Sequence, residues 1–225
     1  MSLNPPVEPV LPLDDVQGAA LPGFLKPYHT LLGIRASDGS TLRTLVRALS
    51  AQIASGRDVL TDRRLWRRRE NMPGRQSPAF VGAAFGFQGL LKLTPGAASM
   101  PSEAFQKGLA QRSALLGDPQ DPGAEGSPAN WKIGGPGNEL DALILVAGDS
   151  REAVDAEAAR IREQIRAANV LLAYDENGGV RPDLPGREHF GFQDGISQPG
   201  IRGRASEEDG DFITERYISP EQKPE

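Results

Sequence analysis

The stretch "LDALILVAGDSREAVDAEAARIREQIRAANVLLAYDENGG", residues 140–179, decides the fold. Its first ten residues contain a continuous apolar run of strand length. Apolar residues then recur at the spacing of one helix face, and charged residues occupy the other face. The apolar face consists of Val154, Ala158, Ile161, Ile165 and Ala168. Residues 169–179 predict a final strand and turn, so the stretch encodes a strand, an amphipathic helix and a second strand.

The start of this helix carries a capping signal. Asp149 is a residue type that caps helices well, and Glu152 follows three positions later, which is the spacing of a capping box. We therefore predict Asp149 as the N-cap.

The first half of the chain repeats this order of elements. "YHTLLGIRA", residues 28–36, predicts a strand, and residues 79–93 begin with another. Between them, apolar residues at helical spacing predict a helix that ends near Gly56: Leu42, Leu45, Val46, Leu49 and Ile53. A repeated strand–helix–strand order predicts an α+β fold, with a ferredoxin-like antiparallel sheet and helices on one face. A doubly wound parallel sheet is the alternative, although four strands are few for one.

Composition shifts suggest the domain boundaries. Residues 1–20 form a Pro-rich arm, and residues 21–180 hold the ferredoxin-like domain. Residues from about 94 to 137 are rich in Gly, Pro, Ser and Asp and predict a long irregular insertion. Residues 181–225 form a separate C-terminal segment.

Bulk properties exclude several classes of function. With 38% hydrophobic and 24% charged residues, the 225-residue chain has the composition of a soluble globular protein. Its net charge of −5 argues against general binding to nucleic acid or anionic membranes. The absence of cysteine excludes thiolate sites, and two histidines make a multi-histidine metal site unlikely to form, so no metal ligand is assigned. The sequence shows neither a secretory signal nor a membrane-length apolar run, so we expect a cytoplasmic protein.

One motif carries candidate chemistry: "EHFGFQDGISQPGIRG", residues 188–203. Its lone acid, Asp194, lies among backbone-permissive glycines, including Gly191 and Gly195. One interpretation is a turn in which the carboxylate caps nearby amides. The other is a carboxylate presented into an apolar pocket, where it moves a proton for a bound substrate.

Other candidates favour structural roles. The basic run Arg63–Arg69 is better explained as an exposed charged helix or loop than as a phosphate site. His29 is expected to pack or hydrogen-bond locally, and His189 to hydrogen-bond within the turn.

The motif "GFQDG" matches the G-x-x-D-G pattern of the dye-decolorizing (DyP-type) haem peroxidases. The resemblance extends in the family's order from about Leu13 to Gly203, through "LDDVQGAALPGFLKPYHTLLGI", "AFGFQGLLKL", "LGDP" and "LILVAGD". An ordered set of this length is more specific than a five-residue pattern.

The resemblance implies a peroxidase that uses haem b, reduces hydrogen peroxide and oxidises dyes or other electron donors. Asp194 would be the distal acid–base residue, and residues 181–225 would line the haem and begin a second half. The implied haem contacts are Gly191, Gly195, Ile196, Ser197 and Gln198. The fold would be of the dimeric α+β barrel type, in a homo-oligomer or completed by a missing C-terminal half.

The chain also departs from the family pattern. Family members are longer, and their second half supplies the haem-ligating histidine and a distal arginine. Neither His29 nor His189 matches that ligand's context. The alternative is therefore a truncated, non-catalytic haem-binding or assembly module that lacks the proximal ligand.

Overall fold

A computed structural model of the chain describes residues 12–69, 77–184 and 187–192. The chain splits into two compact units. The sheet unit comprises Lys26–Ile53 and Gln76–Gly179, and the flanking unit comprises Met1–Leu25, Ala54–Arg75 and Val180–Glu225. The division predicted from the sequence stays a prediction. Within the described ranges, no helix combines the length and apolar character needed to cross a membrane.

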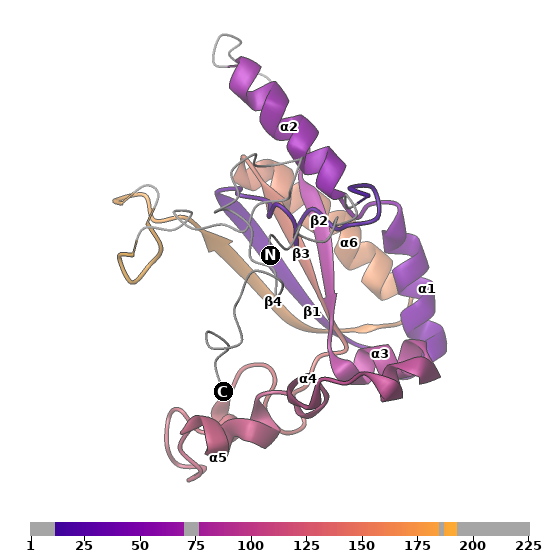
Figure 1. Ribbon diagram of the computed structural model, residues 1–225, viewed down its shortest axis with the longest axis vertical. Coiled ribbons are helices and arrows are strands. Elements are labelled where there is room, and N and C mark those ends of the chain that lie inside the picture. The colour runs from indigo at the N-terminus through magenta and orange to yellow at the C-terminus, as the bar shows by residue number, and fades with distance from the viewer. Residues whose placement is uncertain (1–11, 70–76, 185–186, 193–225) are drawn as a thin grey trace, which may run out of the picture. The chain divides into compact units, whose positions relative to one another are not determined.

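The sheet unit contains a four-stranded sheet in the order β2-β3-β1-β4, and all neighbouring strands are antiparallel. The strands are β1 (Tyr28–Arg35), β2 (Phe80–Phe85), β3 (Ala142–Gly148) and β4 (Leu171–Gly179). The two long helices are α1 (Gly39–Ser50) and α6 (Arg151–Ala167). Each follows one central strand and leads toward the edge strand beyond the other centre (Figure 1). This is the ferredoxin-like α+β fold, and the prediction of fold class is confirmed.

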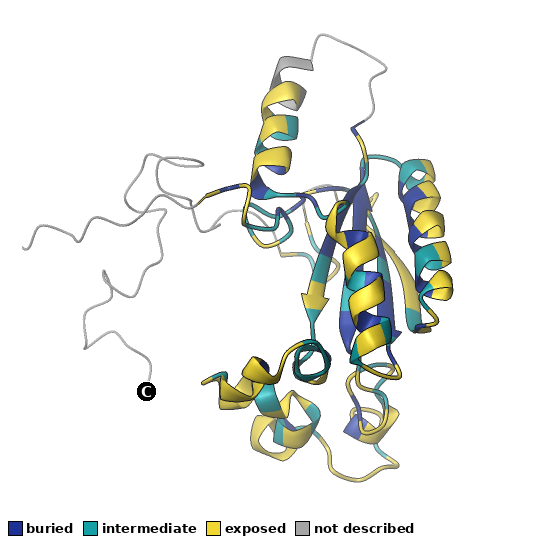
Figure 2. Ribbon diagram, turned by 90° about the vertical axis from the view of Figure 1, so that its right-hand side faces the viewer, coloured by how far each residue is buried: buried dark blue, intermediate teal, exposed yellow. Residues whose placement is uncertain are grey.

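The core lies between the sheet and these two helices. Alternate residues of β1 point into it, and Thr30, Leu32 and Ile34 are at most 1% exposed. The apolar stripes of α1 and α6 meet the same face, so both helices are buried on one side and exposed on the other (Figure 2). The predicted face of α6 is confirmed at Val154, Ala158, Ile161 and Ile165, and Ala168 packs against the core from just beyond the helix.

The start of α6 differs from the prediction. The N-cap is Ser150, whose hydroxyl accepts a hydrogen bond from the Ala153 amide at 3.2 Å. Asp149 is drawn away from that role, because its carboxylate pairs with the Lys26 ammonium at 3.0 Å. The Lys26 side chain is 6% exposed, and its ammonium also lies 5.0 Å from the centre of the Phe80 ring.

Helix α1 also ends earlier than predicted. Asp38 caps its start through the Ser40 and Thr41 amides, and Thr41 completes a capping box. The helix ends at Ser50 rather than near Gly56, because Ile53 turns toward the sheet and bridges to Val81.

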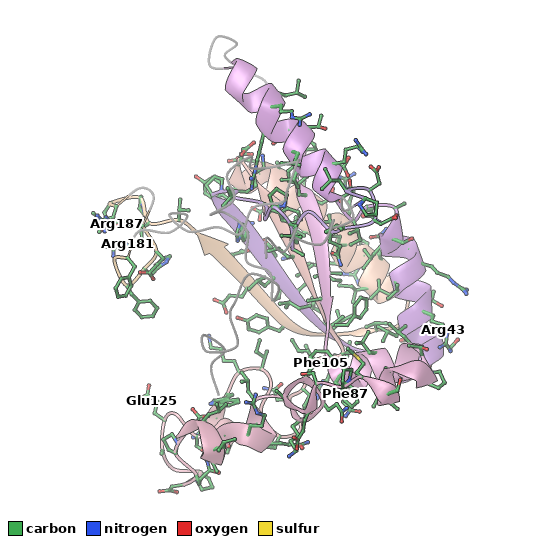
Figure 3. The ribbon with its side chains drawn as sticks, viewed as in Figure 1. Arg43, Phe87, Phe105, Glu125, Arg181 and Arg187 are labelled. Atoms are coloured by element: carbon green, nitrogen blue, oxygen red, sulfur yellow. The ribbon has the colours of Figure 1, made fainter. Side chains whose placement is uncertain are left out.

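The irregular insertion folds as a series of short helices. Its elements, with the helix before it, are α3 (Phe87–Leu93), η1 (Pro95–Ser99), α4 (Glu103–Lys107), η2 (Ala110–Arg112), α5 (Ser113–Leu116) and η3 (Pro128–Asn130). The rings of Phe87 and Phe105 meet edge to face with centroids 6.0 Å apart, which joins α3 to α4 (Figure 3). Amide side chains replace regular secondary structure further on: Asn130 donates to the carbonyls of Pro122 and Ala124.

A buried ion pair joins the ends of the central elements. Asp141, directly before β3, accepts hydrogen bonds from the Ala36 amide and the Lys92 ammonium, both at 2.7 Å. The same ammonium donates to the Ala36 carbonyl at 2.9 Å. Gly89 on α3 permits this approach, because a Cβ there would lie 2.0 Å from the Asp141 carbonyl oxygen. We call Ala36, Gly89, Lys92 and Asp141 the Asp141 bracket.

The flanking unit is built around α2 (Gly56–Arg69). Its first turn receives the N-terminal segment through backbone hydrogen bonds, from Gly18 to Ala54 and from Gly56 to Val16, both 2.7 Å. Arg63 donates to the carbonyls of Pro22 and Gly23. The basic run is thus helical, and its first arginine is occupied by backbone carbonyls.

We predict that Lys92→Met lowers the free energy of unfolding by about 3 kcal/mol, because it leaves the Asp141 carboxylate buried without its cation. The Asp141 side chain is 4% exposed and that of Lys92 33%, which places the loss at the lower end of the usual range. Urea unfolding followed by circular dichroism measures it.

The matched control is Lys107→Met, which removes the lysine of the exposed Lys107–Glu103 pair on α4. That change should stay within about 0.5 kcal/mol. Equal losses in the two variants would contradict a special role for the Asp141 bracket.

Candidate functional site

The described residues reach the first part of the motif. Gly191 and Phe192 are described, whereas Asp194, Gly195, Ile196, Ser197 and Gln198 lie outside the described residues. The roles predicted for these five stay predictions. The geometry that can be analysed is that of the segment leading into them, Val180–Leu184 with Arg187–Phe192, which we call the approach loop.

Gly191 needs its glycine for backbone conformation rather than for space. Its φ is +98°, which side-chain-bearing residues rarely adopt, and no atom lies within 4 Å of the position of a Cβ. The chain therefore turns sharply at Gly191 and leaves its outer side open.

Two arginines hold the backbone of this loop. Arg181 donates to the His189 carbonyl at 3.1 Å, and Arg187 donates to the Gly191 carbonyl at 2.8 Å (Figure 3). Arg181 is itself fixed by two hydrogen bonds to the Asp183 carboxylate, 3.1 and 2.5 Å long. This pairing lowers the pKa of Asp183.

A carboxylate holds the same loop from the donor side. One oxygen of Glu188 accepts the Phe190 amide at 2.8 Å, and the other accepts the Phe192 amide at 2.7 Å. The backbone closes the same turn, since the Glu188 amide donates to the Phe192 carbonyl at 3.0 Å. The hydrogen bond from the Phe190 amide, followed by that from Phe192 and the charges of His189 and Arg181, lowers the pKa of Glu188.

The side chains of the turn itself are apolar and exposed. Phe190 is 89% and Phe192 74% exposed. Fixed aromatic rings of this exposure on either side of an open glycine form a surface suited to a flat apolar group.

The two histidines lie in different surroundings. His189 belongs to the approach loop, where its carbonyl binds Arg181. His29 lies on β1, and its ring hydrogen-bonds with the Lys26 backbone. Its Nε2 is buried and has no hydrogen-bond partner among the described residues. Over those same residues, no group of three or more His, Cys, Asp or Glu side chains is arranged to hold a metal ion.

Comparison with known proteins identifies the family. The DyP dimeric alpha+beta barrel domain matches residues 15–182. The chain belongs to the DyP family. Peroxidase 2 of Mycetinis scorodonius is 28% identical over 89% of this chain and 39% of its own length. Two solved structures, an ancestral D-type dye decolorizing peroxidase and a dye-decolorizing peroxidase in complex with 2,6-dimethoxyphenol, match with 30% and 26% identity and TM-scores of 0.71 and 0.64.

The DyP chain spans about two fifths of these relatives. It covers 88% of itself but 42% of the ancestral structure, and 84% of itself but 39% of the 2,6-dimethoxyphenol complex. The activity, substrates and partners of the whole protein therefore belong to a proposal. Its cytoplasmic location and oligomeric state stay predictions.

Sequence reasoning located the DyP motif but missed the residues that shape its approach. Glu188, Arg181 and Arg187 were ordinary charged residues in the sequence, and only the folded loop brings them onto the backbone of residues 189–192. One signal was available: an acid placed two and four residues before amides in a glycine-containing turn is a potential acceptor for both.

We predict that His29 of the DyP chain titrates below the usual value of 6.5, because burial lowers its pKa and the nearby Arg151 charge lowers it further. Its hydrogen bond with the Lys26 backbone opposes these effects without overcoming them. NMR titration of the imidazole protons measures the midpoint, and a His189→Gln variant assigns the resonances.

The same pKa difference makes stability depend on pH. The unfolded chain binds a proton at His29 more readily than the folded chain, so this contribution is complete above pH 6.5 and is lost as the pH falls through the lower folded pKa. His29→Gln should remove that loss from unfolding curves. A titration midpoint at or above 6.5 would contradict the burial argument.

Proposed function

We propose that the protein containing this chain is a haem-dependent DyP-type peroxidase that reduces hydrogen peroxide and oxidises dyes or phenolic donors. The observation that carries the proposal is the family match over residues 15–182, continued by a G-x-x-D-G motif whose approach loop is fixed by its own side chains. The ferredoxin-like fold agrees with that assignment.

The residues at the approach loop fit one side of a haem. Gly191 is open and sharply turned, and the exposed rings of Phe190 and Phe192 flank it. Such a surface accepts a planar apolar macrocycle without offering a ligand to its iron. Gly191, Gly195, Ile196, Ser197 and Gln198 would contact haem b, which supplies, when bound, the redox-active iron that exchanges electrons with peroxide and donor.

Asp194 would perform the proton chemistry. Its carboxylate accepts a proton from one oxygen of hydrogen peroxide and donates it to the other oxygen, which leaves as water when the O–O bond breaks. A single carboxylate can serve as base and then acid because the same proton is taken and returned. The motif supports this role by placing the acid directly before Gly195, where a side chain does not crowd the approach.

The donor class rests on a relative. One dye-decolorizing peroxidase similar to this chain has been solved in complex with 2,6-dimethoxyphenol. We therefore propose phenolic compounds alongside dyes as donors, in a protein that acts as a homo-oligomer or with a further C-terminal half.

A second function suits the chain by itself: a non-catalytic haem-binding or assembly module. It is favoured by the positions of the described histidines, since His29 is held at the sheet and His189 lies on the motif's own side. Haem titration separates the two functions, because histidine ligation gives a characteristic Soret band.

We predict that Asp194→Asn slows peroxide-dependent oxidation of 2,6-dimethoxyphenol by about 10²–10⁴-fold, because the amide cannot accept and return the proton. The protein is the chain together with whatever its gene encodes downstream, loaded with haem. The Soret band should be unchanged, since the substitution preserves size and leaves the fold intact.

Asp155→Asn on α6, an exposed acid that pairs with Arg151, is the matched control and should keep full activity. Full activity in Asp194→Asn with haem bound would overturn the proposed proton transfer. Failure of wild-type protein to bind haem would overturn the peroxidase assignment itself.

A further inference from the structure

The approach loop is held by contacts from its own side chains. The carbonyls of His189 and Gly191 accept from Arg181 and Arg187, and the amides of Phe190 and Phe192 donate to Glu188. A loop on the surface can leave these groups to water at little cost. Satisfying them internally instead restricts the loop to one conformation.

Glu188 makes the largest contribution to this restriction. It is the side chain that binds two amides at once, with both carboxylate oxygens used, 2.8 and 2.7 Å from their donors. Hydrogen bonds to a charged acceptor are about twice as strong as neutral ones. The carboxylate therefore spans the sharp turn at Gly191 and fixes the peptide planes on both sides of it.

The last amide held in this way lies close to the proposed acid–base residue along the chain. Phe192 precedes Asp194 by two residues. Because consecutive Cα atoms are about 3.8 Å apart, the Asp194 Cα cannot lie more than about 8 Å from that of Phe192. An error in the direction of the chain at Phe192 is thus carried directly to the carboxylate.

We propose that Glu188 is a positioning residue for Asp194. By clamping the Phe190 and Phe192 amides, it sets the direction in which the chain enters the motif and so limits where the Asp194 carboxylate can be placed. This inference rests on the proposed peroxidase function, although the clamp itself does not.

The chemistry of the clamp explains why glutamate is required. Glutamine keeps one acceptor oxygen but presents an NH₂ group to the second amide, so one of the two hydrogen bonds is lost. Alanine loses both. The two substitutions therefore give graded effects, whereas a role that depended only on charge would be abolished equally by both.

Charged groups around Glu188 must be separated from the clamp. Arg181 and His189 both act on the carboxylate electrostatically, and Arg187 binds the loop beside it. Glu163→Gln on α6 is a matched control, because it removes an equal charge from an exposed glutamate that pairs with an arginine, Arg166.

The first test measures the clamp without any cofactor. Amide hydrogen exchange at Phe190 and Phe192 is followed by NMR in the wild-type chain and in Glu188→Ala, Glu188→Gln and Glu163→Gln. We expect about tenfold faster exchange at both amides in the alanine variant, faster exchange chiefly at one amide in the glutamine variant, and no change in Glu163→Gln. Unchanged exchange in Glu188→Ala would overturn the clamp.

The second test measures positioning in haem-loaded protein extended by its downstream sequence. Glu188→Ala should lower the rate constant for reaction with hydrogen peroxide by tenfold or more, since displacements near 1 Å cost up to about 10²-fold. Glu188→Gln should fall between it and wild type. The KM for 2,6-dimethoxyphenol and the Soret band should not change.

The double variant Glu188→Ala/Asp194→Asn distinguishes the outcomes. If Glu188 acts through Asp194, the double variant reacts no more slowly than Asp194→Asn alone. A further fall would overturn the inference, as would a normal peroxide rate in Glu188→Ala when Asp194→Asn is slow. A normal rate in Asp194→Asn would instead overturn the proposed function and leave the exchange result standing.

Discussion

The sheet unit depends on one buried carboxylate. Asp141 lies where β3 begins, beside the residue that follows β1 and against α3, and it satisfies the Ala36 amide and the Lys92 ammonium together. A buried charge is costly unless it is paired and hydrogen-bonded. The geometry that meets this demand also fixes the ends of three elements, because Lys92 returns a hydrogen bond to the Ala36 carbonyl.

Further packing depends on this arrangement of elements. The Asp141 carbonyl accepts from the Gly86 amide at 2.9 Å, which holds the end of β2 beside the start of β3. On the other side of α3, Arg43 of α1 donates to the carbonyls of Lys92 and Leu93. The helical layer and the sheet are therefore aligned at this end by polar contacts, while apolar burial supplies most of the stabilisation elsewhere.

The sequence predicted those features that depend on local periodicity. The four strands and the two core helices were predicted because alternation and helical spacing report which face is buried. Position-specific contacts were less predictable. Asp149 was a sound N-cap in sequence terms, yet its partner is Lys26, 123 residues away, and no local pattern reveals that pairing.

The candidate site shows the same division between local pattern and contact. The motif was found because its resemblance to the DyP family is written in consecutive residues. The clamp at Glu188 was not, because an exposed glutamate has the same appearance whether it faces water or two amides. Its role appears only when the sharp turn at Gly191 brings Phe190 and Phe192 back over the carboxylate.

Two different forms of precision result. The Asp141 bracket is buried, so its hydrogen bonds are strengthened by the low dielectric around them and its loss affects the whole sheet unit. The approach loop is exposed and competes with water, so it gains order by using several charged side chains on consecutive backbone groups. Order achieved in this way is local to residues 181–192. It can therefore shape the segment before the acid without adding to the stability of the sheet unit, and changes in the loop should be separable from changes in folding.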